Sequence, residues 1–349
     1  MKYNLHSKAI DALRGLAAAA VFFSHSDTSG LATNAWFSAN KSFLGDFGVY
    51  VFFCLSGYLI WQSGTRLIGS PGGIRLFAIH RVTRLVPLYL VNLFIVVAAI
   101  SYIGSRWTPT YDSWIIFRHL IFSQDFYPSV SRDINPVLWT LTHEATFYIL
   151  APLMLMAGIR NKIVILLASL ALYGVFLLNG WIEYLKFSQI FYAFALGIFI
   201  ADADNKEKVA ICLIAVSLAL YACLGDSLHA YAGRIAGTAF AMTCICLTKG
   251  KECNKLVYVL MSPLVFLGVI SYSIYIWHYQ IIYVVEYYYP FFNRNIPGWS
   301  QYGMVSGTVL VSICVLFSYI SYVLIEKPSM GKLRIAIERK SKLRPASAA

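Results

Sequence analysis

The sequence is poor in charged residues, which make up only 13% of its 349 positions, and it contains no low-complexity linker and no internal repeat. Soluble globular proteins carry about 25% charged and about 45–50% apolar residues, whereas 59% of this chain is apolar. These proportions exclude an ordinary soluble enzyme, a disordered protein and a disulfide scaffold. They are typical of a polytopic membrane protein.

The chain also lacks the cysteine patterns of metal and redox sites. None of its seven cysteines forms a Cys-X-X-Cys pair, and Cys244-Ile-Cys246 has no histidine at the spacing of a zinc site. Six of the cysteines lie in apolar runs, where free cysteine behaves as a small apolar residue. We therefore expect no metal ion and no redox chemistry.

Ten apolar runs are candidates for transmembrane helices, each of which needs about 20 residues. They lie near residues 9–26, 44–62, 85–104, 138–158, 163–180, 187–201, 209–225, 229–248, 258–288 and 303–325. The segment 111–123 is shorter and carries three ionisable residues, so we expect it to be interfacial or re-entrant. The sequence thus predicts an all-α, multi-pass membrane domain over residues 1–330 with about ten spans, followed by a basic cytoplasmic tail at 331–349.

The basic residues form a topology signal. If the N-terminus is inside, 20 of the 28 lysines and arginines fall in the inner connections and in the two ends of the chain. Cytoplasmic loops are enriched in these residues, so we expect both termini in the cytoplasm. The net charge of +12 is explained by this bias, and we predict membrane lipids rather than nucleic acid as partners.

Two ionisable residues lie inside the first predicted helix. Arg14 and His25 are eleven residues apart, or about three turns, so they share one face and lie about 16 Å apart along the axis. Ionisable residues inside a span are costly and usually functional. The structural alternative is that Arg14 extends toward the cytoplasm and His25 caps the outer end of the helix.

Two later helices carry further candidates. Asn135-Pro136 is a helix-start signal, and Glu144 follows about two turns below the outer surface, at a depth similar to that of His25. His278, in the ninth run, also falls in the outer half. As alternatives, Glu144 could belong to a structural pair and His278 could be a core histidine. His143 points to another face and could be a bystander.

Small and basic residues near the inner side suit a ligand with phosphates. Arg81 and Arg84 share one face at the start of the third helix, and two guanidinium groups suit phosphate, although each also fits the positive-inside bias. Ser56 and Gly57 in the second helix either let helices approach closely or let a slender ligand pass.

Together these residues indicate acyl transfer. A histidine with a carboxylate partner is the usual means of activating a hydroxyl. The separation of Arg14 and His25 suits an extended pantetheine arm better than one small substrate. We infer transfer from cytoplasmic acyl-CoA to a hydroxyl on the outer side.

The chain also resembles the acyltransferase-3 family of integral membrane acyltransferases, from Asp11 to Pro328. Two positions depart from the family pattern: Tyr50 replaces a small or acidic residue, and Ala145 replaces a second glutamate. The resemblance rests on six motifs in order: Asp11-Ala-Leu-Arg14-Gly15 with His25, Gly48-Val-x-x-Phe-Phe-x-Leu-Ser56-Gly57, Arg81-x-x-Arg84-Leu-x-Pro87, Leu138-Trp139-Thr-Leu-x-x-Glu144-x-x-Phe147-Tyr148, Ser271-Tyr272-Ser-Ile-Tyr275-x-x-His278 and Ile325-Glu326-Lys327-Pro328.

The resemblance implies ten core helices, an acetyl-CoA donor and a sugar hydroxyl as acceptor. The sugar would belong to a surface glycan or lipid-linked oligosaccharide, such as lipopolysaccharide O-antigen or exopolysaccharide. It also implies that His25 is catalytic and that Arg14, Arg81 and Arg84 serve acyl-CoA. We therefore expect an O-acetyltransferase of a bacterial inner membrane, with His25 as general base and Glu144 or His278 orienting it or the acceptor.

Alternatives remain open. Intramembrane Arg, Glu and His also suit a proton relay in a transporter of a glycolipid or small solute, but transporters often show repeated halves with broken helices, and the sequence shows neither. Another type of membrane acyltransferase would place a histidine and an asparagine on cytoplasmic loops, which the position of His25 disfavours. Direct transfer and a route through an acyl-enzyme on His25 both fit these residues.

Overall fold

The computed structural model describes residues 3–26, 35–103, 113–126, 134–179, 186–203, 207, 214, 218, 231–295 and 304–342. These residues are almost entirely helical. The strands found among them are the two-residue β1 (Tyr3–Asn4) and β2 (Glu252–Cys253), which pair antiparallel. The prediction of an all-α protein is therefore confirmed.

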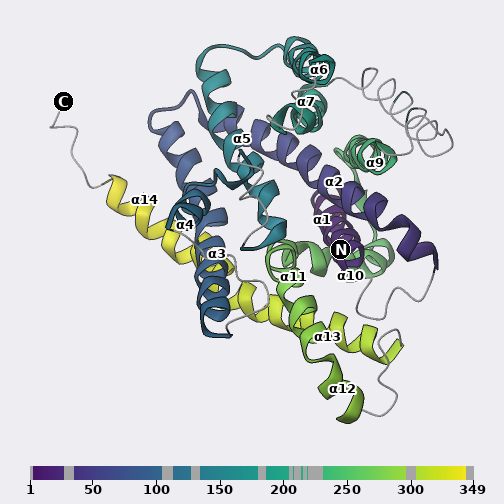
Figure 1. The fold of residues 1–349 in the computed structure, drawn as a ribbon. Coiled ribbons are helices and arrows are strands. Elements are labelled where there is room, and N and C mark those ends of the chain that lie inside the picture. Colours follow the sequence, from purple (N-terminus) through teal and green to yellow (C-terminus); the bar gives the residue numbers. More distant parts are fainter. Residues whose placement is uncertain are drawn as a thin grey trace. The chain divides into compact units, whose positions relative to one another are not determined.

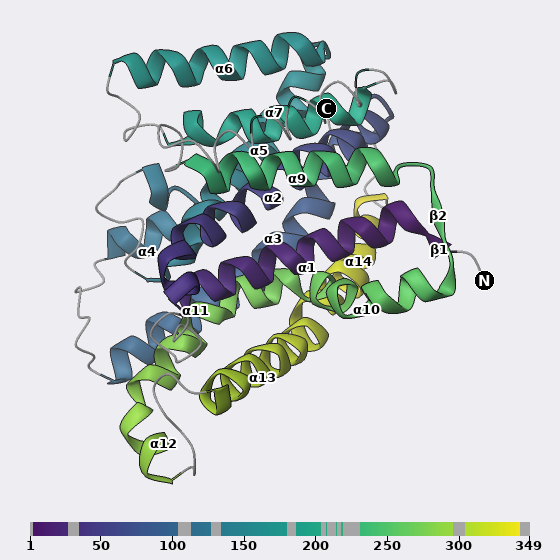
Figure 2. The ribbon, with the colours of Figure 1, turned by 90° about the vertical axis from the view of Figure 1, so that its right-hand side faces the viewer.

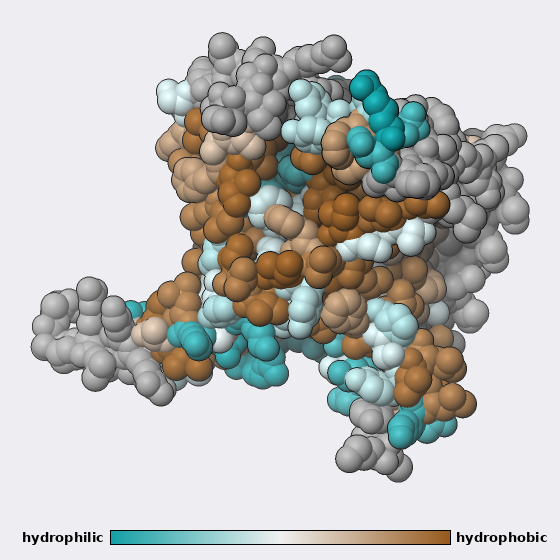
Figure 3. All heavy atoms as spheres, turned by 90° about the horizontal axis from the view of Figure 1, so that it is seen from below, coloured by the Kyte–Doolittle hydropathy of each residue, from teal (hydrophilic) through white to brown (hydrophobic). Residues whose placement is uncertain are grey.

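Three stretches of helix in the described residues are long and apolar enough to cross a membrane. They are Ala39–Leu67 in α2 (Ala35–Leu67), Gly73–Ala99 in α3 (Gly73–Ile103) and Val305–Glu338, which begins in α13 (Met304–Ser321). Large apolar side chains are exposed over wide areas of the described surface, as brown spheres show in Figure 3. Membrane helices present such side chains to lipid.

A fourth candidate span is broken. The ninth apolar run forms α10 (Lys255–Val269) and α11 (Ser271–Tyr287), which meet at an angle of 67°. An uninterrupted apolar run does not record where the backbone turns, so the sequence did not reveal this break. The described residues thus contain three or four helices that could span a membrane, and the total of ten and the sides of the termini stay predictions.

The other predicted runs appear as helices of 16 to 21 residues. They are α1 (Leu5–His25), α5 (Trp139–Met156), α6 (Lys162–Leu178), α7 (Phe187–Asp202) and α9 (Ala232–Thr248). The segment 111–123 contains the eight-residue helix α4 (Ser113–Leu120), which is too short to span a bilayer. The seventh run, 209–225, lies almost wholly outside the described residues.

The chain forms two compact units. Unit 1 comprises Met1–Leu59 and Asn161–Phe317, and unit 2 comprises Ile60–Arg160 and Ser318–Ala349. The colours of Figure 1 follow the chain through both units. The division into a domain at 1–330 and a tail at 331–349 stays a prediction.

In unit 1, α1 packs along α10 and beside α11 (Figure 2). The backbones of α1 and α10 touch directly at two glycines. A Cβ added to Gly268 would lie 1.7 Å from the Asp11 carbonyl oxygen, and one added to Gly15 would lie 2.1 Å from the Leu264 carbonyl oxygen. Glycine at both positions therefore lets the helices touch, and this contact fixes the rotation of α1 that places Arg14 and His25.

In unit 2, the end of the chain folds back on α3. Two short stretches, Tyr322–Glu326 and Ser329–Leu333, lead into α14 (Arg334–Lys342), which packs against α3. Glu338 of α14 lies 3.0 Å from His80 Nε2 and 3.5 Å from Arg334 Nε. Both pairs are partly exposed, so they contribute at most about 1 kcal/mol each.

We predict that Gly268→Ala destabilises the protein. The new methyl group would force α1 and α10 apart, and overpacking of this kind costs about 3 kcal/mol. The measurement is the apparent unfolding temperature of the purified protein in detergent. Gly174→Ala on α6 is the control, because nothing lies within 4 Å of its added Cβ. Equal unfolding temperatures for the two variants would contradict the close contact.

Candidate active site

The structure brings two of the predicted site residues together in unit 1. His25 at the end of α1 and His278 in the middle of α11 have ring centroids 5.2 Å apart, and His278 Nε2 lies 3.4 Å from His25 Nδ1. Tyr279 stands edge-on to His25 at 5.7 Å. His278 is fully buried, whereas His25 is half-buried. The packing of α1 along α10 and α11 thus makes a histidine pair from residues 253 positions apart in the sequence.

Backbone carbonyl groups fix the proton positions on both rings. His278 Nδ1 lies 3.1 Å from the Ile274 oxygen and 2.8 Å from the Tyr275 oxygen, and His25 Nδ1 lies 2.9 Å from the Val21 oxygen. Since a carbonyl oxygen only accepts, each Nδ1 carries the proton and donates it. The lone pair, and with it the basicity, is therefore on Nε2 of each neutral ring.

Arg14 lies half-buried on α1, about 16 Å before His25 along the helix axis. Within the described residues, no hydrogen bond or ion pair engages its guanidinium group. Its positive charge is therefore available to an anionic ligand that reaches this face of α1.

Three further predicted residues gather in unit 2. Tyr148 donates a hydrogen bond of 2.6 Å to Glu144 Oε1, and the Arg81 guanidinium lies 5.6 Å from the Tyr148 ring centre. Arg84 is close enough to act electrostatically on the same tyrosine. Arg81 also lies over Phe77, and its buried Nε has no hydrogen-bond partner in the described part of the chain.

Glu144 lies close to residues that the sequence assigned to the other half of the membrane. Arg81 and Arg84 both act on Tyr148, the hydrogen-bond partner of Glu144. Asn135, at the start of this segment, is fully buried and donates a 3.0 Å hydrogen bond to Asn92 of α3. The depth of Glu144 in a membrane stays a prediction.

Gly57 is a contact point between helices. A Cβ added to it would lie 2.2 Å from the Phe194 carbonyl oxygen of α7, so no larger residue fits. This agrees with the first of the two roles considered for Ser56 and Gly57, the close approach of helices. Ser56 is half-buried next to it. A role for either residue beside the donor stays a prediction.

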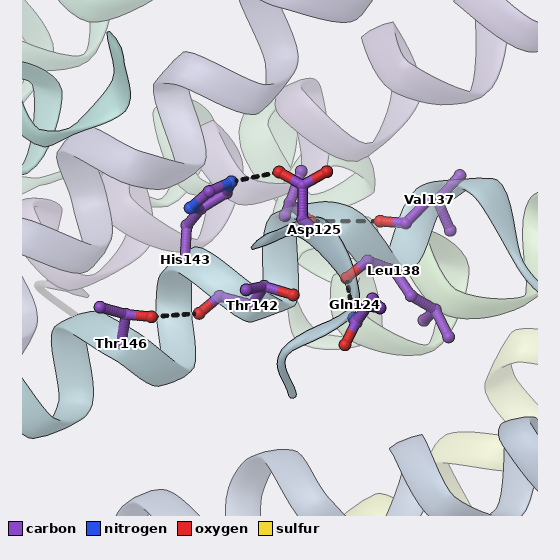
Figure 4. A network of polar contacts seen from close by, with 8 residues as sticks. Gln124, Asp125, Val137, Leu138, Thr142, His143 and Thr146 are labelled. Atoms are coloured by element: carbon purple, nitrogen blue, oxygen red, sulfur yellow. Dashed lines mark hydrogen bonds and ion pairs between the residues drawn. The ribbon is translucent and has the colours of Figure 1, made fainter. Parts of the chain in front are cut away.

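His143 is not a bystander. Its Nε2 lies 2.7 Å from Asp125 Oδ2, both side chains are fully buried, and Figure 4 shows them pointing toward each other. The rings of Phe126 and Trp139 stand edge-on to the imidazole at 6.4 Å and 5.8 Å. Asp125 belongs to a short 3-10 turn, Gln124–Phe126. The pair therefore ties the segment after α4 to the start of α5, one residue before Glu144.

Sequence reasoning missed Asp125 because it lies outside the apolar runs, in a segment taken to be a loop. The one available signal was His143, since a buried histidine requires a partner. Within the described residues, no group of three or more His, Cys, Asp and Glu side chains lies close enough to hold a metal ion.

Comparison with known proteins agrees with these features. The acyltransferase-3 family model, described as an acyltransferase domain, matches residues 7–323. "Putative O-acetyltransferase SACOL0978" of Staphylococcus aureus (strain COL) is 26% identical over 342 residues, covering 83% of this chain and 54% of its own length. The chain thus spans about half the length of this relative.

A second relative is matched over most of its own length. "Exopolysaccharide production protein ExoZ" of Rhizobium meliloti (strain 1021) is 27% identical over 307 residues, covering 83% of this chain and 91% of that protein. No solved structure is significantly similar to the chain.

We predict that Asp125→Ala destabilises the protein, because removing one partner of a buried hydrogen-bonded pair leaves the other polar group unsatisfied, which costs about 1–3 kcal/mol. The unfolding temperature in detergent measures this effect. Glu338→Ala is the matched control, since it removes the carboxylate of a histidine pair in which both side chains are 28% exposed. We expect that control to change stability by less than Asp125→Ala does, because both pairs of Glu338 are partly exposed. A small effect of Asp125→Ala would contradict a structural role of the buried pair.

Proposed function

The chain belongs to the acyltransferase-3 family, and on that basis we propose that it is a membrane O-acetyltransferase that transfers an acetyl group from acetyl-CoA to a sugar hydroxyl of a cell-surface polysaccharide. The observation that carries this proposal is the paired imidazoles of His25 and His278 on α1 and α11. An exopolysaccharide production protein among the relatives supports a polysaccharide acceptor, such as exopolysaccharide or lipopolysaccharide O-antigen.

His25 is proposed as the general base. With its Nδ1 proton held by the Val21 carbonyl oxygen, Nε2 is the atom that accepts the proton of the acceptor hydroxyl. The same carbonyl stabilises the imidazolium ion that forms. His278 acts as a positioning residue, since its Nε2 faces His25 Nδ1 and holds the ring in place.

The reaction balances without a further reagent. The hydroxyl oxygen attacks the thioester carbonyl carbon while His25 Nε2 takes the hydroxyl proton. The carbon–sulfur bond then breaks, and the proton passes from His25 to the departing thiolate of CoA. An ester of the sugar and free CoA result. In the two-step variant, His25 Nε2 itself attacks the thioester carbonyl carbon and the carbon–sulfur bond breaks. The sugar hydroxyl then attacks the acetyl-imidazole, the bond to Nε2 breaks, and the hydroxyl proton passes by way of His25 to the CoA thiolate.

The arginines are proposed to bind the donor. Arg14, half-buried and without an ion-pair partner among the described residues, suits the phosphate or pantetheine portion of CoA. Arg81 and Arg84 are further candidates for its phosphates, and Ser56 and Gly57 for contact with its slender arm. We propose Glu144 as a positioning residue for these arginines through Tyr148. A bacterial inner membrane would place donor and acceptor on opposite sides.

We predict that His25→Gln lowers kcat for acetyl transfer at least about 100-fold, because general bases contribute roughly 10²–10⁴ in rate. His278→Gln should lower kcat less, with little change in the KM for acetyl-CoA. Release of CoA thiol and acetyl transfer by protein in lipid nanodiscs measure both.

His6→Gln is the control for this experiment. His6 also lies on α1 and also makes side-chain hydrogen bonds, to Tyr58 at 2.8 Å and Thr248 at 3.1 Å, but it stands at the opposite end of the helix. We expect it to keep kcat within a few-fold of the wild type. Full activity of His25→Gln would overturn the proposal, and solute flux without thiol release would favour a transporter.

A further inference from the structure

A cluster of polar and aromatic side chains joins three helices of unit 1 and has no part in the chemistry described above. Arg234 of α9 donates from Nε to Asp46 Oδ2 of α2 at 2.9 Å and from Nη1 to Gln189 Oε1 of α7 at 3.3 Å. Figures 1 and 2 show α9 and α7 running beside α2. The cluster therefore depends on the packing of all three helices.

Tyrosine rings surround this polar centre. The Arg234 guanidinium lies 5.7 Å from the Tyr50 ring centre and 5.4 Å from that of Tyr231. Tyr192 lies 5.8 Å from Tyr50, and Tyr173 lies 6.2 Å from Tyr192. Tyrosine offers an apolar face together with a hydroxyl group, a combination that suits a ligand with both apolar and polar surfaces.

The cluster is open to a ligand. The side chains of Asp46 and Arg234 are 30% and 27% exposed, and Tyr231 is 39% exposed. The bonds above use Asp46 Oδ2 and Arg234 Nε and Nη1. Among the described residues, the second carboxylate oxygen of Asp46 has no hydrogen-bond partner, while the Arg234 guanidinium also forms a hydrogen bond with the Tyr50 side chain. One acceptor oxygen thus remains for a ligand, beside a guanidinium group whose side chain is partly exposed.

The cluster also lies beside the candidate base. A Cβ added to Gly45, the residue before Asp46, would lie 3.1 Å from Ser24 Oγ, and Ser24 Oγ lies 3.1 Å from His25 Nδ1. On its other side, the Asp46 Cβ would lie 3.0 Å from a Cβ added to Gly233, next to Arg234. The turn of α2 that carries Gly45 and Asp46 thus lies between Ser24, which neighbours His25, and Gly233, which neighbours Arg234.

We infer that the cluster of Asp46, Gln189, Arg234 and their tyrosines is the binding subsite for an uncharged pyranose unit of the acceptor. The inference rests on the proposed function and names the chemistry of its acceptor. Neighbouring sugar hydroxyls both donate and accept hydrogen bonds, so one can donate to the second oxygen of Asp46 while the next accepts from the partly exposed Arg234 guanidinium. The C–H face of the ring would lie on a tyrosine.

The charges of the cluster discriminate between ligands. A lone arginine would favour phosphate or a uronic acid. Here the carboxylate of Asp46 offsets the guanidinium charge and repels anions. An uncharged sugar is therefore favoured over phosphate and over acidic sugars.

Saturation-transfer NMR on wild-type protein in nanodiscs, without donor, tests the binding. The probes are the methyl glycosides of glucose, galactose, mannose and rhamnose, with glucuronate and inorganic phosphate for comparison. We expect transfer to at least one neutral glycoside and weaker or no transfer to the anions. Transfer to none of the neutral glycosides, or stronger binding of the anions, would overturn the subsite.

Variants then connect the subsite to the reaction. Asp46→Asn, Arg234→Lys and Tyr231→Leu should each raise the KM for the acceptor about tenfold, with kcat and the rate of acetyl-CoA hydrolysis in water nearly unchanged. The acceptor is the neutral glycoside that binds. Tyr231→Leu changes an exposed side chain, so it tests the proposal even if the other two variants fold poorly. If the ion pair were merely structural, its variants would instead lower both kcat and the yield of folded protein. That result would contradict the subsite.

Lys162→Gln is the matched control. It breaks the ion pair of Lys162 with Glu207 in the same unit, and Lys162 lies over Phe199, ten residues or about 15 Å along α7 from Gln189. We expect it to leave the acceptor KM unchanged. Binding of a neutral glycoside without acetylation would keep the subsite and reject the proposed function. Acetylation with an unchanged acceptor KM in all three cluster variants would keep the proposed function and reject the subsite.

Discussion

The contact of α1 with α10 is the constraint on which the candidate active site depends. Gly15 and Gly268 let the two backbones touch, and this fixes which face of α1 is turned toward α11. His25, three turns beyond Arg14, then meets His278. The proposed general base, its neighbouring imidazole and the half-buried arginine are thus placed by two residues that have no side chain.

Polar side chains within apolar surroundings are costly unless they are paired, and several of those described here have a defined partner. His278 donates to carbonyl groups of its own helix, His143 meets Asp125, and Tyr148 donates to Glu144. These pairings fix protonation states and ring positions before any substrate binds. Such preorganisation suits an enzyme that must activate a hydroxyl inside a membrane.

The sequence predicted the helical class and the residues of the histidine pair, because apolar length and ionisable residues within apolar runs are visible without a structure. It did not predict the break between α10 and α11, since hydropathy is continuous there. It did not predict that Glu144 and Arg81 both contact Tyr148, because side-chain contacts between distant parts of the chain are not visible in the sequence. It also missed Asp125 and the Asp46–Arg234 pair, whose partners are distant in sequence.

The central claim is that this chain acetylates a surface polysaccharide through His25. The most direct measurement is the acetyl content of that polysaccharide, by proton NMR, from cells that express the wild type, His25→Ala or no copy. The account predicts acetyl signals with the wild type alone, while the His25→Ala protein is still present in the membrane. Equal acetyl content in all three would contradict it.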